Sequence, residues 1–154
     1  MSPFAIRRLG PDDLAAARAV NALFAEVFAD PVSYASALPR DAYLRRLLGS
    51  ETAIVLIAEC DERIVGALVA YVLEKFEQER SEIYAYDLAV DERHRRRGIA
   101  TALIEELKRI APGIGAWMIF IQADQGDDPA IRLYEGLGRR EEVVHFDIAP
   151  QATR

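Results

Sequence analysis

An arginine-rich turn is the stretch of the sequence whose residue types best suit an anionic ligand. Three arginines precede a glycine, and after this glycine apolar residues recur at helical spacing. The first turn of a helix leaves backbone N–H groups without partners, and the helix dipole adds positive potential there. We therefore predict that this turn binds a diphosphate, the alternative being a solvated surface turn. The residues concerned are Arg95, Arg96, Arg97, Gly98, Ile99, Ala100 and Thr101.

A second block, downstream, has the capping signals of a helix that carries a tyrosine. Asp127 and Asp128 precede Pro129, and an acidic cap followed by proline is typical of a helix start. Tyr134 lies one turn after Ala130 on the same helix face. The sequence alone leaves two roles open for Tyr134, an ordinary core tyrosine or a residue of a ligand site.

Hydrophobic periodicity predicts the elements that must position these blocks. Strands are expected over residues 4–9, 52–60, 63–72, 81–90, 116–121 and 143–148, and helices from 10 to about 30 and over 41–48, 98–110 and 129–137. This order predicts an α/β or α+β fold in which helices cover a sheet. No repeat or linker interrupts the chain, so we expect one domain over residues 1–154.

Composition narrows the classes of partner. The net charge of −6 argues against nucleic acid, and no apolar run reaches the roughly 18 residues of a membrane span. The N-terminus lacks the order of a signal peptide, so we expect a cytoplasmic location. The single cysteine, Cys60, excludes a disulfide within the chain and a cysteine-rich metal site, and no metal is expected.

The two blocks together resemble the GNAT acetyltransferases. The turn lacks the GxGxxG and P-loop spacings, but residues 95–100 are similar to the Q/R-x-x-G-x-G/A pattern of that family. Residues 127–138 resemble its N-x-x-A-x-x-x-Y-x-x-x-G block, with Asp127 in place of the usual asparagine. The resemblance implies a GNAT fold, with a mixed, mostly antiparallel sheet flanked by helices and splayed between the fourth and fifth strands.

The same resemblance implies acetyl-CoA as cosubstrate and assigns roles around it. Leu88, Ala89 and Val90 would line the pantetheine arm, and the N–H near Leu88 would serve the thioester carbonyl. Asp127 and Ala130 would belong to the cofactor site. Tyr134 would lie near the sulfur and protonate the departing thiolate.

A base must take a proton from the attacking amine, and the predicted strand 81–90 holds the candidates. Strand alternation puts Glu82, Tyr84, Tyr86, Leu88 and Val90 on one face and Asp87 on the other, unless a bulge re-aims it. Tyrosines have an ordinary pKa of about 10 and are poor bases at neutral pH. Glu82 is favoured by its face and Asp87 by its closeness to the reacting carbon, so both stay candidates beside the alternative of a salt bridge.

Carboxylates around this strand predict a negative wall suited to a polycation, unless they form a solvated acidic surface. Glu74, Glu77 and Glu79 precede the strand, and further acids follow the next one. The residues expected to contact the acceptor are Glu82, Tyr84, Tyr86, Asp124, Glu142, His145 and Asp147.

Longer blocks over residues 75–90, 122–130 and 140–148 resemble the class I aminoglycoside 3-N-acetyltransferases, which are gentamicin-resistance enzymes. The resemblance implies acetylation of the 3-amino group of deoxystreptamine aminoglycosides, direct transfer in a ternary complex, and a homodimer. Two alternatives stay open. One is an acetyltransferase for a polyamine or another cationic amine, and the other is a CoA-binding sensor without turnover.

Overall fold

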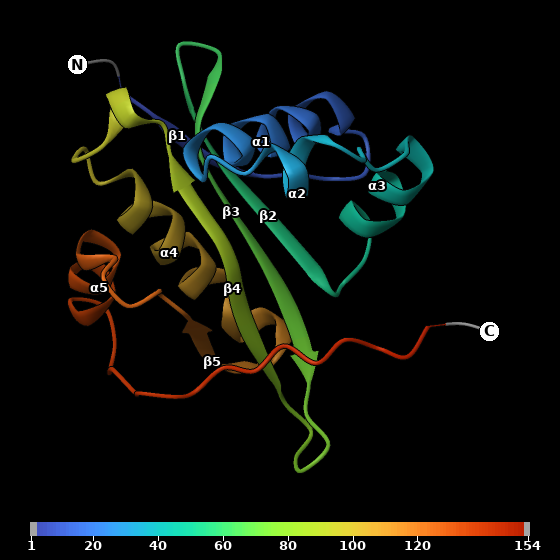
Figure 1. Cartoon of the computed structure of the whole chain (residues 1–154), viewed down its shortest axis with the longest axis vertical. Helices are drawn as coiled ribbons and strands as arrows, with labels where there is room; N and C mark the ends of the chain where they lie inside the picture. The colour runs from blue at the N-terminus through green and yellow to red at the C-terminus, as the bar shows by residue number, and fades with distance from the viewer. Residues whose placement is uncertain (1–2, 153–154) are drawn as a thin grey trace. The chain divides into compact units, whose positions relative to one another are not determined.

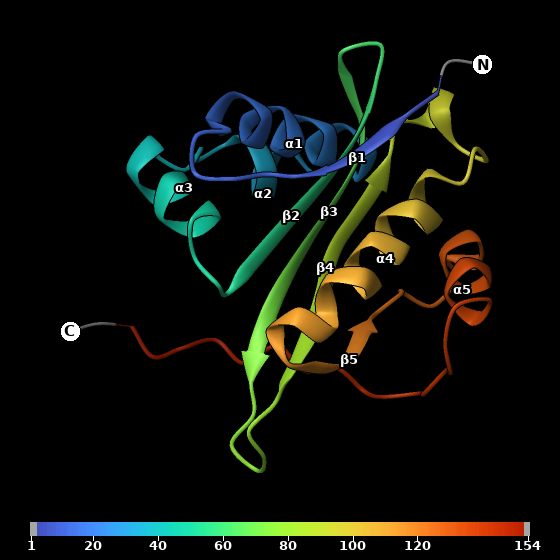
Figure 2. The same cartoon turned by 180° about the vertical axis from the view of Figure 1, so that it is seen from behind.

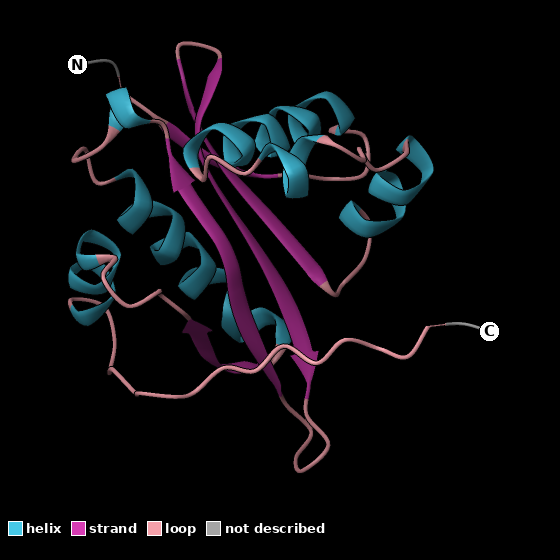
Figure 3. Ribbon diagram, viewed as in Figure 1, coloured by secondary structure: helices cyan, strands magenta, loops and turns pink. Residues whose placement is uncertain are grey.

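Five strands form one mixed sheet in the computed structural model, which describes residues 3–152 (Figure 3). The strands lie in the sheet in their order along the chain. The first three pairings are antiparallel, whereas β4 and β5 run parallel, so the predicted mixed, mostly antiparallel sheet is confirmed. The strands are β1 (Ala5–Arg8), β2 (Ala53–Cys60), β3 (Arg63–Glu74), β4 (Ser81–Val90) and β5 (Ala116–Ile121).

The parallel pair of strands is joined over only part of its length. Pairing runs from Ser81 to Ala85 of β4, and β5 ends opposite Ala85 at Ile121. The second half of β4, residues 86–90, continues without pairing to β5. The expected splay between the fourth and fifth strands is therefore confirmed.

Helices cover both faces of the sheet (Figures 1 and 2). On one face, Leu23 and Phe24 of α1 and Leu44 of α3 share a buried cluster with Ile57 of β2 and Ala67 of β3. α4 packs on the other face, against β2, β3 and β4. The helical elements are α1 (Leu14–Val27), α2 (Pro31–Ala35), α3 (Asp41–Leu48), the 3-10 turn η1 (Glu92–His94), α4 (Ile99–Ile110) and the 3-10 turn η2 (Ala111–Ile114).

A glycine in β3 lets α4 approach the sheet closely. A Cβ atom built on Gly66 would lie 2.8 Å from Cγ2 of Ile99, the first residue of α4. Ile99 is 2% exposed and fixed in the core. Because only glycine leaves room for this side chain, Gly66 sets the height at which the N-terminus of α4 lies above the sheet.

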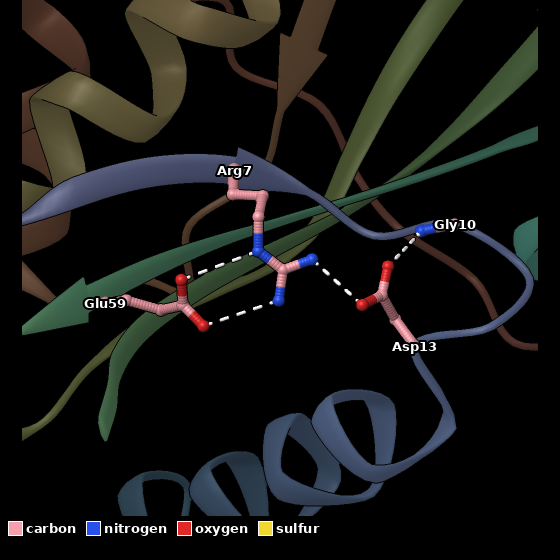
Figure 4. Close-up of polar contacts among 4 residues, drawn as sticks. All are labelled: Arg7, Gly10, Asp13 and Glu59. Atoms are coloured by element: carbon pink, nitrogen blue, oxygen red, sulfur yellow. Dashed lines mark hydrogen bonds and ion pairs between the residues drawn. The ribbon is translucent and has the colours of Figure 1, made fainter. Parts of the chain in front are cut away.

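A polar cluster joins the first two strands to the start of α1 (Figure 4). The Arg7 guanidinium donates to Glu59 on β2 at 3.4 Å and to the Asp13 carboxylate at 2.9 Å. The other oxygen of Asp13 accepts from the Gly10 N–H at 2.7 Å. This backbone hydrogen bond and the Arg7 guanidinium hold the pKa of Asp13 below its ordinary value. The cluster fixes the turn through which β1 leads into α1.

Most predicted elements of this unit are confirmed, with differences where backbone geometry intervenes. The helix expected from residue 10 begins at Leu14, so Asp13 is its N-cap and no acidic residue lies in its first turn. The helix ends at Val27, before Asp30 and Pro31, and Ala29 has a positive φ of 51°. Asp30 and Pro31 instead start α2, which the sequence pattern did not indicate, and the Asp30 carboxylate accepts from the Ser33 N–H at 3.0 Å.

The chain divides into two compact units, the first ending at Gln122 and the second beginning at Ala123, and one domain over residues 1–154 stays a prediction. The second unit holds α5 (Asp128–Glu135). Asp127 is the N-cap and accepts from the Ala130 N–H at 3.3 Å. Pro129 lies at the second helical position rather than the first, and the helix ends two residues before the expected Leu137.

The strand expected over residues 143–148 is wrong. This stretch has neither helix nor strand in the structure and is drawn as loop in Figure 3. Val143, Val144, Phe146 and Ile148 are 70 to 90% exposed. The alternating pattern had suggested a strand, but a strand needs backbone partners and these residues pair with none of the described strands. No helix within residues 3–152 has the length and apolar character to cross a membrane.

Candidate active site

The arginine-rich turn leads into the N-terminus of α4 in the way that anion binding requires. Gly98 is the N-cap in the left-handed conformation, with φ of 78°, and Arg96 also has a positive φ of 60°. The first helical hydrogen bond runs from the Ala102 N–H to the Gly98 carbonyl at 2.9 Å. The N–H groups of residues 99–101 therefore have no acceptor within the helix and point out of its positive end.

The residues of this turn fit a pyrophosphate group. Arg95 and Arg96 are exposed, and nothing lies within 4 Å of a Cβ placed on Gly98, so the backbone can be approached from outside. Gly98 is thus required by its positive φ rather than by crowding. Free N–H groups, a helix dipole and flanking guanidinium groups are the donor set that a diphosphate prefers. Arg97, Ile99, Ala100 and Thr101 lie in the same turn or at the start of the helix, as predicted.

The splayed half of β4 presents its backbone at an open strand edge. The Asp91 N–H donates to the carbonyl of Val65 on β3 at 2.8 Å, so the backbone groups of Asp91 point toward β3. Along a strand of an antiparallel pair, the N–H and C=O groups of one residue point to the partner strand and those of the next residue point away from it. Leu88 and Val90 therefore turn their N–H and C=O groups away from β3, toward the side that β5 leaves unpaired.

A bulge in β4 corrects the predicted distribution of its side chains. The register skips Tyr86, because consecutive residues of β3 pair with Ala85 and with Asp87. The extra residue reverses the alternation beyond it. Asp87 and Ala89 therefore share the α1 face with Tyr84, whereas Leu88 and Val90 lie on the α4 face. The prediction that Leu88 and Val90 share the face of Tyr84 is wrong, and the bulge considered for Asp87 is present.

Asp87 lies half-buried on this face and receives a strong hydrogen bond. The Tyr34 hydroxyl of α2 donates to Oδ1 of Asp87 at 2.6 Å. Burial raises the pKa of the Asp87 carboxyl, and the hydrogen bond from Tyr34 opposes that rise. Burial and the Asp87 carboxylate raise the pKa of Tyr34, which stays a donor throughout the neutral range. A carboxylate with a raised pKa is suited to accept a proton near neutral pH.

A row of aromatic rings extends from Asp87 across three strands. Tyr86 packs edge-on against Tyr71 of β3 and Tyr84 of β4, with ring centroids 5.7 and 5.0 Å apart. Tyr84 stacks on Phe120 of β5 at 4.5 Å, and its hydroxyl donates to the Gln122 side chain at 2.6 Å. Tyr86 is 58% exposed. This aromatic row (Tyr71, Tyr84, Tyr86 and Phe120) offers flat apolar faces with hydroxyl groups.

Two of the acids expected to form a negative wall around β4, Glu77 and Glu82, have basic partners. Glu82 pairs with Lys75 at 3.4 Å, and Glu77 pairs with Arg80 at 3.4 Å. Lys75 also lies 4.0 Å from Glu77. These two carboxylates are thus partly neutralised by basic neighbours, whereas the partner of Asp87 is the uncharged hydroxyl of Tyr34. Among residues 3–152, no three metal-ligating side chains lie close enough together to hold a metal ion.

In the second unit, the predicted site residues have mostly local partners. Burial raises the pKa of Tyr134 to about 12, so its hydroxyl is protonated at neutral pH. Glu142 pairs with Arg140 at 2.9 Å, and His145 with Asp147 at 2.9 Å. The backbone carbonyl of Asp124 accepts a hydrogen bond from the Asp127 N–H at 3.1 Å. His145 and Asp147 lie in the exposed stretch 143–148 that was expected to be a strand, and Glu142 directly precedes it.

Sequence reasoning missed three residues of the first unit that lie around Asp87. Tyr34 is on the unpredicted helix α2, Tyr71 faces Tyr84 across the β3–β4 pair, and Phe120 stacks on Tyr84 from β5. The register of the β3–β4 hairpin could have indicated Tyr71. No local pattern indicated Tyr34, because its contact with Asp87 joins residues 53 positions apart.

Comparison with known proteins adds an independent finding. A sequence model described as the acetyltransferase (GNAT) family matches residues 17–138, which is most of the chain. A curated relative, N-acetyltransferase 8B of Rattus norvegicus, is 28% identical over 90 residues. That alignment covers 58% of this chain and 40% of the rat protein, so the chain spans less than half of that relative's length.

Two solved structures from uncultured soil metagenomic samples match nearly the whole chain. One, an aminoglycoside acetyltransferase, is 52% identical, covers 97% of this chain and 99% of its own, and superposes with a TM-score of 0.94. The other, an aminoglycoside acetyltransferase in complex with sisomicin, is 33% identical, covers 96% and 97% of the two chains, and has a TM-score of 0.87.

Proposed function

The chain belongs to the acetyltransferase (GNAT) family and uses acetyl-CoA as cosubstrate, and from this premise we propose that it acetylates an amino group of an aminoglycoside. The observation that carries the proposal is the position of Asp87. Its half-buried carboxylate shares a sheet face with the aromatic row, and the residue next to it turns its backbone to the open edge of β4. The proposed base, Asp87, and the open backbone edge proposed for the acetyl donor are thus next to each other on β4.

The donor would bind along β4 and the turn that follows it. Residues 95–101 would hold the pyrophosphate through N–H groups and guanidinium groups. The backbone of Leu88 and Val90 would pair with the amide groups of the pantetheine arm, as an added strand pairs with an edge. The Leu88 N–H would donate to the thioester carbonyl oxygen as it gains negative charge.

The reaction forms a C–N bond and breaks a C–S bond. The acceptor ammonium gives one proton to Asp87, and its neutral nitrogen then attacks the thioester carbonyl carbon. The nitrogen loses a second proton as the C–S bond breaks; this proton replaces through solvent the one that the thiolate takes from its acid, and Asp87 releases the first to solvent. The thiolate leaves, and we assign Tyr134 as the group that protonates it, since its hydroxyl carries a proton at neutral pH. Asp87 is preferred to Glu82 as the base because the carboxylate of Glu82 forms an ion pair with Lys75.

The aromatic row suits a sugar better than a linear polyamine. Flat rings stack on the apolar faces of sugar rings, and ammonium groups are attracted to aromatic faces. Two of the carboxylates that would attract a polycation, Glu82 and Glu77, are paired with Lys75 and Arg80. A relative that was solved with sisomicin, an aminoglycoside, supports the same substrate class. Tyr84 and Tyr86 would contact the acceptor, and Glu82, Asp124, Glu142, His145 and Asp147 stay proposed contacts.

The finer features of the proposal come from the resemblance to the 3-N-acetyltransferases. They are transfer to the 3-amino group, direct transfer in a ternary complex, a cytoplasmic location and a role in antibiotic resistance. A homodimer is a further feature of the proposal. The exposed apolar residues Val143, Val144, Phe146 and Ile148 support it, because apolar surface of this kind gains stability when a partner covers it.

Release of thiol from acetyl-CoA by the purified protein tests the proposal. Sisomicin, gentamicin, spermidine and a lysine-rich peptide serve as acceptors. Turnover with the two aminoglycosides and none with the other amines is expected, and NMR of the product would identify the acetylated nitrogen. Turnover with spermidine or the peptide alone would refute the substrate class. Binding of CoA without turnover on any amine would favour a sensor.

A further inference from the structure

We propose that Tyr34 is a positioning residue for the general base, and that it holds one oxygen of Asp87 so that the other faces the acceptor amine. This inference rests on the proposed function, in which Asp87 takes the proton of the amine. It assigns a role to the short helix α2, which neither the sequence motifs nor the donor site involves.

The contact itself is short and directional. The Tyr34 hydroxyl lies 2.6 Å from Oδ1 of Asp87, within the range of charge-assisted O–H···O⁻ bonds. A carboxylate only accepts, so the hydroxyl must be the donor. Within residues 3–152, Tyr34 is the side-chain partner of Asp87, and Oδ2 accepts no hydrogen bond. One oxygen is therefore held and the second keeps its lone pairs for a proton.

The ring of Tyr34 is held by two phenylalanine rings. It packs against Phe24 of α1 and against Phe28, the residue that follows this helix, with centroid separations of 5.6 Å in both cases. The helix that carries it is started by Asp30, whose carboxylate accepts from the Ser33 N–H. Because the ring is fixed by packing, its hydroxyl directs the Asp87 carboxylate rather than following it.

The hydrogen bond also opposes the effect of burial on the base. Burial favours the neutral acid and raises the pKa of Asp87, whereas a donor on the charged form lowers that pKa. The other ionisable groups that interact with Asp87 are Tyr71 on β3 and Tyr84 on β4, while Tyr86 precedes it in the strand and Asp30 interacts with Tyr34. The pKa values of Tyr71 and Tyr84 are raised by burial and that of Asp30 is lowered by the hydrogen bonds of Ser33, so of these groups Asp87 is the one whose pKa moves from the acidic side toward neutrality.

The substitution Tyr34→Phe tests this role, because it removes the hydroxyl and keeps the packed ring. We expect the acidic limb of kcat/KM to move up by about one pH unit, since a hydrogen bond to the ionised carboxylate is lost. Activity near neutral pH should fall about tenfold and recover at higher pH, with an unchanged KM for acetyl-CoA. Tyr43→Phe, which alters an exposed tyrosine ring packed against Arg46, is the matched control and should leave the profile in place.

Two outcomes would overturn the proposal. One is a profile of Tyr34→Phe that coincides with that of the unaltered protein, and the other is an equal loss at every pH, which would indicate packing alone. A carboxyl-carbon NMR titration of Asp87 gives a readout without turnover, and its pKa should rise in Tyr34→Phe. If no amine is acetylated, the proposed function fails, while the titration still decides whether Tyr34 controls Asp87.

Discussion

Replacing Gly66 by alanine tests how the sheet sets the position of the N-terminal end of α4, the proposed phosphate-binding end. The new Cβ would lie 2.8 Å from Cγ2 of Ile99 and 3.4 Å from the Ala89 carbonyl oxygen. The first of these separations is shorter than real contacts allow, so Ile99 must move. Ile99 is 2% exposed and has no open space to enter, and the shift therefore passes to the start of α4.

The magnitude follows from two opposing effects. Adding a methyl group to a packed core costs about 1–3 kcal/mol, while the reduced freedom of the unfolded chain returns about 0.4–1 kcal/mol. We expect a net loss of about 1–2 kcal/mol in the free energy of unfolding, or a fall in Tm of roughly 2–8 °C for a chain of this size. Because the N–H groups of residues 99–101 move with Ile99, the KM for acetyl-CoA should rise several-fold.

A double-mutant cycle with Ile99→Ala isolates the contact. Ile99→Ala alone should cost about 2–5 kcal/mol, and the combined variant should cost about 1–2 kcal/mol less than the sum, because the alanine methyl enters the space that isoleucine leaves. Gly113→Ala is the control, since nothing lies within 4 Å of its Cβ, and should stay within about 0.5 kcal/mol. Additive effects within about 0.5 kcal/mol, measured by urea unfolding, would refute the reasoning.

Three further predictions concern the base, the donor site and the N-terminal polar cluster. Asp87→Asn should lower kcat by about 10²-fold or more in the thiol-release assay, whereas Glu82→Gln should lower it less than tenfold, and the reverse order would make Glu82 the base. Arg97→Ala should raise the KM for acetyl-CoA and leave the KM for the aminoglycoside unchanged, and an unchanged acetyl-CoA KM would remove Arg97 from the donor site. Asp13→Asn should lower the free energy of unfolding by about 1 kcal/mol at pH 7. Since the folded-state pKa of Asp13 is lowered, its contribution is present above the unfolded pKa and is lost as the pH falls through the folded value, so the difference should vanish in acid unfolding experiments.

Local patterns predicted the parts of the fold that local interactions determine. The strands 81–90 and 116–121 and the helix 41–48 occur with the expected bounds, since alternation and helical spacing follow from burial on one face. The arginine-rich turn and the Asp127 cap were also predictable, because helix-terminus chemistry depends on residues within one turn. In these stretches, sequence neighbours are also the neighbours that matter in space.

The features that the sequence did not indicate depend on partners far along the chain. Residues 143–148 have the alternation of a strand, but alternation does not supply the second strand that pairing requires. The helix α2 is five residues long, too short to show a period, and its hydrogen bond to β4 spans 53 positions. The bulge at Tyr86 has no sequence signature either, because it is visible only in the register with β3.

In the proposed reaction, the bulge allows one strand to contact two substrates. β4 would turn backbone groups to the donor at its open edge and a carboxylate to the acceptor on its face. In a regular strand Asp87 would share the face of Ala85, which is buried on the α4 side, and an unpaired carboxylate there would be costly. The extra residue moves Asp87 to the face of Tyr34 and the aromatic row, while Leu88 still points its backbone to the open edge. A single inserted residue thus puts the Asp87 carboxylate on one face and leaves the Leu88 backbone at the open edge, the arrangement that the proposed base and donor site require.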